Sequence, residues 1–235
     1  MAYYDSIARQ WHKTTGYRGG EFKRLVLNDV LLESIPDIDG RSILELGAGN
    51  GYFIPLVLRK YSGKIPARIV ITDQSSKLIE IAQKNFSIET AEYRILNVAR
   101  KFPFADENFD MILATMIFNE VSTGVLRKAL AESSRVLANG GVFLITVTHP
   151  DFINSLRKRS LLKGSGKGVL TMPGAGGLRL PVVVRKVEVY RRVLEELGFK
   201  YEEKSIYPTQ EVLNAKPGLR NAGNIPLALL FRCVK

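Results

Sequence analysis

Residues 43–53, ILELGAGNGYF, are the most informative stretch of the chain. An apolar run of strand length leads directly into a turn that has glycine at alternate positions, Gly47, Gly49 and Gly51. Glycine permits a tight chain reversal, and the missing Cβ lets a ligand approach the backbone amides. The stretch therefore predicts a buried strand, a ligand-binding turn and the start of a helix.

Two side chains within this stretch indicate which ligand the turn suits. A dinucleotide fingerprint G-x-G-x-x-G beginning at Gly47 needs a small residue at position 52, where this chain has Tyr52. Glu45 places a carboxylate at the strand end, which is unfavourable beside a pyrophosphate and tolerable beside a positively charged ligand. S-adenosylmethionine (SAM), with its sulfonium and ammonium groups, is such a ligand.

Three further segments extend this interpretation. Residues 71–85, ITDQSSKLIEIAQKN, contain Asp73 at 22 residues beyond Gly51, and residues 95–121 contain PFADENFD, of the form PF-x-(D/E)-x-x-FD. Residues 135–147 read RVLANGGVFLITV. In these motifs the chain resembles the class I SAM-dependent methyltransferases, specifically the small-molecule group related to ubiquinone-biosynthesis methyltransferases. The resemblance covers about residues 40–150.

Alternating apolar runs and helical patterns predict an α/β fold. Strands are expected at 42–46, 68–72, 92–96, 109–114 and 142–148, with helices near 51–61, 75–86 and 122–138 between them. Right-handed crossovers then give a mostly parallel sheet with helices on both faces. A helix near 186–197 and strands near 199–206 and 226–233 follow. The resemblance implies a Rossmann-like sheet of seven strands in the order 3-2-1-4-5-7-6, the last strand antiparallel.

Composition is that of one domain spanning residues 1–235. With 46% hydrophobic and 24% charged residues, the chain can bury an α/β core without metals or disulfides, and no metal ligands are predicted. Cys233 is the single cysteine and is expected to be a structural thiol. No apolar stretch has the length of a membrane span, and the first residues lack a signal-peptide core, so a cytoplasmic location is expected.

The donor site is expected at the carboxyl ends of the strands. The candidate SAM-binding residues, several of them implied by the resemblance, are Tyr17, Glu45, Gly47, Ala48, Gly49, Asp73, Gln74, Asn97, Val98, Thr115 and Met116. Asp73 offers two acceptors to a ribose diol, or alternatively belongs to a helix cap. Asn97 falls where relatives read adenine, often with Asp, or alternatively forms a turn. The product would be S-adenosylhomocysteine.

Methyl transfer needs alignment of the acceptor more than it needs a strong catalytic group. Where the acceptor is protonated, a base helps, and His149, just after the fifth strand, is the best-placed candidate. Asp151 could orient His149 or bind the acceptor. Asn119 and Glu120 could contact polar groups of the acceptor. The alternative for His149 is a structural strand terminator whose imidazole bonds to backbone.

Two segments are expected to select the acceptor. Residues 1–38, rich in aromatic side chains, resemble a helical cover over the donor pocket; these aromatics either close on ligand or dock the helix. Residues 150–187 are expected to form a basic, glycine-rich lid. Between 154 and 187 there is no acidic residue, and the basic ones are Arg157, Lys158, Arg159, Lys163, Lys167, Arg179, Arg185 and Lys186. They either attract an anionic acceptor or phosphate backbone, or are simply solvated.

The function predicted is methyl transfer from SAM to an oxygen or nitrogen of a small molecule, and the basic segment would suit an anionic one. An RNA or DNA methyltransferase is an alternative because of the basic lid. Against it, strand four ends in ATMIFNEV instead of (D/N/S)-P-P-(Y/F), and Cys233 is wrongly placed for a 5-methylcytosine mechanism. A non-catalytic SAM-binding module is a third alternative. The oligomeric state is not predicted.

Overall fold

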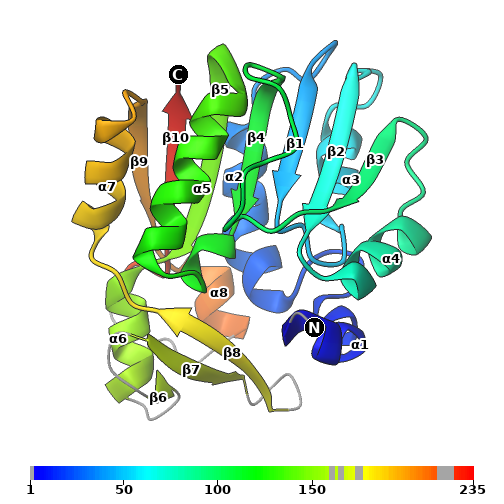
Figure 1. Cartoon of the computed structure of the whole chain (residues 1–235). Coiled ribbons are helices and arrows are strands. Elements are labelled where there is room, and N and C mark those ends of the chain that lie inside the picture. Colours follow the sequence, from blue (N-terminus) through cyan, green and yellow to red (C-terminus); the bar gives the residue numbers. More distant parts are fainter. Residues whose placement is uncertain (1–2, 159–161, 164–166, 173–176, 216–224) are drawn as a thin grey trace.

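A mostly parallel seven-stranded sheet forms the centre of the computed structural model (Figure 1). The structure describes residues 3–158, 162–163, 167–172, 177–215 and 225–235. In spatial order the strands are β3 (Ala91–Ile95), β2 (Arg68–Asp73), β1 (Ser42–Leu46), β4 (Phe109–Thr115), β5 (Leu137–Thr148), β10 (Ala228–Val234) and β9 (Lys200–Ile206). Strand β10 runs antiparallel to both β5 and β9. The predicted fold and strand order are therefore confirmed.

Alternation along the central strands builds one apolar core on each face of the sheet. Ile43 belongs to the core under α2 (Asn28–Ser34) and α3 (Phe53–Lys60), whereas Leu44 belongs to the core under α5 (Thr123–Val136) and α7 (Val187–Glu196). Both residues are completely buried. Because successive strand side chains point to opposite faces, continuous apolar runs such as β1 are needed for a sheet covered on both sides. Figure 1 shows these two helical layers.

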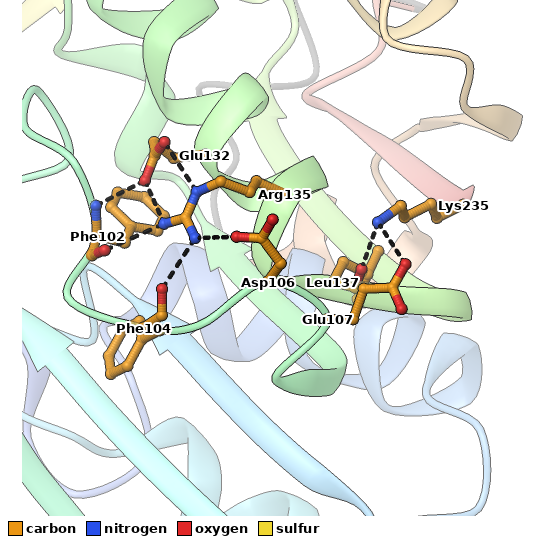
Figure 2. A network of polar contacts seen from close by, with 8 residues as sticks. All are labelled: Phe102, Phe104, Asp106, Glu107, Glu132, Arg135, Leu137 and Lys235. Atoms are coloured by element: carbon orange, nitrogen blue, oxygen red, sulfur yellow. Dashed lines mark hydrogen bonds and ion pairs between the residues drawn. The ribbon is translucent and has the colours of Figure 1, made fainter.

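The PF-x-(D/E)-x-x-FD signature has a structural explanation in Arg135 of α5 (Figure 2). Its Nη1 donates to the carbonyl of Phe104 at 2.9 Å and to Asp106 at 2.7 Å, while Nη2 donates to the carbonyl of Phe102 at 3.1 Å and to Glu132 at 2.7 Å. Arg135 also lowers the pKa of the Glu132 carboxyl by hydrogen bonding. One guanidinium thereby fixes the loop that leads from β3 into β4.

The stretch expected to be a basic lid contains regular structure that the sequence did not predict. Helix α6 (Pro150–Lys158) is followed by an antiparallel three-stranded sheet. Its strands are β6 (Leu162–Lys163), β7 (Lys167–Met172) and β8 (Leu178–Val183). Residues 159–161, 164–166 and 173–176 of the expected lid, including part of its glycine-rich sequence, lie outside the described residues.

Helices and the small sheet gather at the carboxyl ends of the parallel strands (Figure 1). They include α1 (Tyr3–Thr15), the π-helix η1 (Lys23–Leu27), α4 (Ser76–Asn85), the 3-10 turn η2 (Ile117–Asn119) and α8 (Gln210–Ala215). Tyr4 and Ala8 of α1 pack on Leu78 of α4 and on Leu180 of β8. This edge of the sheet therefore carries most of the elements that can form a site.

No helix in the described part of the chain is both long and apolar enough to cross a membrane.

Replacement of Gly51 by alanine is expected to destabilise the fold. Gly51 has φ 77°, and a Cβ there would lie 2.7 Å from Cβ of Ala82 in α4. Backbone strain and overpacking together should cost about 3 kcal/mol of unfolding free energy. Gly63→Ala is the control, because Gly63 has φ 89° with nothing within 4 Å, and only about 1 kcal/mol is expected. Urea denaturation measures both variants, and equal losses would contradict the packing argument.

Candidate functional site

A cavity of about 380 Å³ lies at the carboxyl ends of the central strands. Its walls include eight of the residues predicted to bind the donor: Gly47, Gly49, Asp73, Gln74, Asn97, Val98, Thr115 and Met116. These residues follow β1, β2, β3 and β4 in turn, so the parallel sheet brings them together. Met116 adopts φ 66°, a left-handed conformation that is uncommon outside glycine.

The glycine loop after β1 lies against two other elements of the cavity wall. A Cβ at Gly47 would lie 2.5 Å from Cδ1 of Ile117 in η2, and one at Gly49 would lie 3.0 Å from Nε1 of Trp11 in α1. Both glycines have positive φ, 63° and 62° respectively. Any side chain at either position would therefore strain the backbone and push the wall outward.

Asp73, at the end of β2, fastens the glycine loop to the start of α4. Its Oδ2 accepts from the amide of Gly49 and its Oδ1 from the amide of Ser75, both at 2.9 Å. Ser75 in turn caps α4 by accepting from the amide of Leu78 at 3.2 Å. Burial raises the pKa of the Asp73 carboxyl, while these amides oppose the shift. Each carboxylate oxygen keeps a further lone pair for a ligand hydroxyl.

Glu45 is a buried carboxylate directly behind the glycine loop. It is 2% exposed, and its Oε2 has no hydrogen-bond partner among the described residues. Burial raises its pKa to about 7, although Lys23 opposes this shift. Lys23 of η1 lines the cavity, its Nζ lies 5.2 Å from the ring centre of Tyr52, and burial lowers its pKa. The Glu45 carboxylate is thus influenced by the cation Lys23, and one of its oxygens lacks a hydrogen-bond donor in the described part of the structure.

Glu120, just after η2, is the second carboxylate with a strongly shifted pKa. It lines the cavity, and the hydroxyl of Tyr4 in α1 donates a hydrogen bond to it. Burial raises the pKa of Glu120 to about 7; Tyr4 opposes the shift and Asp73 adds to it. A carboxyl group that titrates near neutrality and faces a cavity can exchange a proton with a ligand.

Residues 43–141 match the family described as "Methyltransferase domain". The fold is that of the S-adenosylmethionine dependent methyltransferase from Mesorhizobium loti, with a TM-score of 0.70, 18% identity, and 92% of this chain and 99% of that chain covered. Residues 43–141 form a class I SAM-dependent methyltransferase domain. The predicted methyltransferase family is confirmed for these residues, and SAM is the cofactor of this domain. The narrower resemblance to ubiquinone-related enzymes stays a prediction.

The curated relatives of this methyltransferase domain are named as uncharacterized proteins or methyltransferases. The chain is 28% identical over 167 residues to the uncharacterized protein MJ1252 of Methanocaldococcus jannaschii, which covers 71% of this chain and 58% of that protein. It spans about half the length of the curated relatives it matches. A methyltransferase in complex with the Trm112 activator of Haloferax volcanii has a TM-score of 0.69, 15% identity, and 98% and 93% coverage.

The charges around the cavity fit SAM. Asp73 and Glu120 line the cavity, Glu45 lies behind its glycine loop, and Lys23 is the cation that influences the pKa of all three. A ligand with a sulfonium and an ammonium would add the missing positive charge. The unpartnered Oε2 of Glu45 is a buried acceptor that such a ligand, or a water bridging to it, could satisfy. The methyltransferase domain therefore holds a site of suitable size and sign for its cofactor.

Three of the predicted donor-binding residues do not line the cavity of the methyltransferase. Glu45 lies behind the loop, as does Ala48, which is 5% exposed and donates its amide to the carbonyl of Thr72 at 2.8 Å. Tyr17 is 61% exposed, and its ring makes edge contacts with His12 and Phe86. The donor-binding roles of Ala48 and Tyr17 stay predictions.

The predicted catalytic residues also lie outside the described cavity wall. The side chain of Asn119 bonds Thr148 twice, donating to its hydroxyl at 3.1 Å and accepting from its amide at 2.9 Å. His149 is 8% exposed, and its Nδ1 accepts from the amide of Asp151 at 3.2 Å. Burial lowers the pKa of His149, while Asp151 opposes the shift. These bonds hold the end of β5 against η2 and the start of α6.

The structure adds residues that the sequence did not single out for this site. Lys23 lines the cavity from η1 and Pro181 lines it from β8. Neither stands in a recognisable motif, since each reaches the cavity through tertiary contacts of a segment outside residues 43–141. The aromatic side chains of α1 are expected from the sequence to close on ligand or to dock the helix, and Tyr3, Tyr4 and Trp11 line the cavity. Trp11 lines the cavity close to Gly49, and its ring makes an edge contact with Tyr4 of the same helix.

Replacement of Glu45 by glutamine is expected to change how stability depends on pH. A carboxyl whose pKa rises on folding binds more protons in the folded state, so stability falls as pH rises from about 4.5 to 7. Glu45→Gln removes this loss. Between pH 5 and pH 8, the unfolding free energy of the variant should therefore fall by on the order of 2 kcal/mol less than that of wild type. Exposed Glu89→Gln is the control. Parallel pH profiles for wild type and Glu45→Gln in urea denaturation would contradict the assignment.

Proposed function

We propose that this chain transfers the methyl group of SAM to an oxygen or nitrogen of a small-molecule acceptor. The observation that carries the proposal is the cavity, where the glycine loop, Asp73 and an excess of carboxylates meet at the carboxyl ends of β1, β2 and β4 of a methyltransferase domain. Bound SAM would supply an activated methyl group, so the chain's own residues have mainly to hold and align the acceptor.

A cover over the cavity supports a compact acceptor. The hydroxyl of Tyr3 in α1 donates to the carbonyl of Arg179 in β8, and Leu180 packs against the cluster formed by Tyr4, Ala8 and Leu78. Tyr3, Tyr4, Trp11 and Pro181 all line the cavity. Because α1 and β8 meet across it, a nucleic acid would have to extrude a single base to reach the donor. This arrangement favours a small molecule over RNA or DNA, which stays the alternative along with a non-catalytic SAM-binding module.

Two groups are proposed as the base for acceptors that need one. Glu120 lines the cavity, and burial raises its pKa to about 7, which is the range that suits a general base at neutral pH. His149, proposed from its place after β5, is held by the amide of Asp151 and would have to reach the acceptor from behind η2. The position of Glu120 favours it as the group that takes the acceptor's proton.

Asp73→Asn is expected to weaken donor binding by about 1.5 to 3 kcal/mol, because an ionised acceptor for ligand hydroxyls is lost. Calorimetric titration with SAM measures the effect. Asp29→Asn, an exposed site on α2, is the matched control. Thermal melting of each variant separates a loosened glycine loop from a lost ligand contact, since Asp73 also binds the Gly49 amide. Equal SAM affinity in all three proteins would remove Asp73 from the donor site.

Incubation with methyl-labelled SAM and fractionated cell extract tests the function itself. Label is expected in small metabolites; label in nucleic acid would support the alternative enzyme, and SAM binding without transfer would support the non-catalytic module.

With the labelled acceptor at saturating donor, Glu120→Gln should lower kcat by about 10²-fold or more. His149→Gln should leave kcat nearly unchanged. The reverse result would assign the base to His149.

A further inference from the structure

The small sheet presents its basic residues on one face. Cross-strand pairing sets Lys163 opposite Val169 and Arg179 opposite Thr171, and Lys167 lies two residues before Val169 on β7. Paired residues, and residues two apart on one strand, share a face. All five line a second hollow of about 650 Å³. We call this surface, formed by Lys163, Lys167, Val169, Thr171 and Arg179, the basic face.

The opposite side of the small sheet is apolar and fixes this orientation. Leu162, Leu178 and Val182 are 3%, 2% and 8% exposed. Leu162 and Val182 belong to the same core cluster as Phe152 and Leu156 of α6. A shift of one residue in register would bury the cations and expose these apolar side chains. The outward position of the basic face is therefore dictated by the packing of the sheet.

Among the residues that the structure describes, no carboxylate pairs with the basic face. Within the described ranges, none of the side chains of Lys163, Lys167 and Arg179 forms an ion pair, and all three residues are exposed. The sequence from 154 to 187 contains no aspartate or glutamate at all. A concave surface of one sign attracts ligands of the opposite sign.

The basic face and the donor cavity share a wall. Pro181 of β8 lines the donor cavity, while its cross-strand partner Val169 lines the second hollow. Arg179 precedes Pro181 by two residues on the same strand, a spacing of about 7 Å. A ligand that rests on the basic face can therefore extend past Pro181 toward the methyl donor.

We propose that the basic face binds a phosphate-bearing arm of the methyl acceptor while the acceptor's nucleophile enters the cavity beside Pro181. This inference rests on the proposed function and specifies the class of acceptor. Arg179 lies opposite Thr171, which is four residues beyond Lys167 on β7, so the basic face extends about 14 Å along the strand. That length exceeds one phosphate group and suits a diphosphate or a longer chain. Arg179 supplies the planar fork that binds phosphate with two hydrogen bonds.

Inorganic tripolyphosphate is the probe that tests this site by calorimetry. The triple variant Lys163→Gln, Lys167→Gln, Arg179→Gln is expected to bind it at least about tenfold more weakly than wild type. The control triple variant Lys84→Gln, Lys128→Gln, Arg192→Gln removes the same charge from exposed positions on α4, α5 and α7 and should stay within about twofold. Melting temperature and SAM affinity, unchanged in both triple variants, show that the donor site and the fold are intact.

Failure of this proposal and failure of the proposed function give different results. Equal tripolyphosphate affinity in the two triple variants, or no binding to wild type, would overturn the basic face as a phosphate site. A single-stranded RNA oligonucleotide that binds wild type more tightly than tripolyphosphate, and loses affinity in the basic-face variant, would overturn the small-molecule form and assign the face to nucleic acid. Tripolyphosphate is expected to compete with the labelled acceptor without changing the affinity for SAM. If wild type did not bind SAM at all, the proposed function alone would be refuted.

Discussion

Close approach at the glycine loop is the constraint on which the rest of the structure depends. Gly47, Gly49 and Gly51 each have positive φ, and a Cβ at each would meet a different element, η2, α1 and α4 respectively. Asp73 then ties the loop to the start of α4 through the Gly49 amide. Such a motif is usually explained by ligand access. Here the glycines are also needed for packing, because η2, α1 and α4 lie directly against the loop. Donor binding and fold stability therefore use the same backbone.

Electrostatics at this joint are unfavourable without a ligand. Glu45 and Glu120 both have a pKa raised to about 7 by burial, with Lys23 opposing the shift in each. A cationic donor would favour their ionised forms, so donor binding near neutral pH should release protons. Lys23 alone therefore offsets the charges of Glu45 and Glu120 only in part. Carboxyl groups with such shifted pKa values are common at ligand-binding and catalytic sites.

Local patterns predicted the strands and helices around the central sheet, because each follows from its own run of residues, whereas the strand order came from the family resemblance. The apolar run of β1 and the Ser75 cap of α4 need no distant partner to be recognised. The small sheet was missed because short strands in a basic, glycine-rich sequence carry no clear period. Lys23 was missed for another reason, since only tertiary packing brings η1 to the glycine loop. His149 lies at the expected strand end, yet a backbone bond to Asp151, invisible in sequence, sets its orientation.

The site divides along the same boundary as the family match. The glycine loop, Asp73 and Glu120 lie within residues 43–141, whereas Tyr4, Lys23 and Pro181 of the cavity wall lie outside it. Donor chemistry is common to a family, so its residues belong in the shared segment, while acceptors differ and their contacts belong in the flanking ones. Strand β8 contributes to both the cavity and the basic face. On the proposed function, a change in β8 would alter contacts with the acceptor while leaving the glycine loop intact, so we assign acceptor selection to the segment that follows β5.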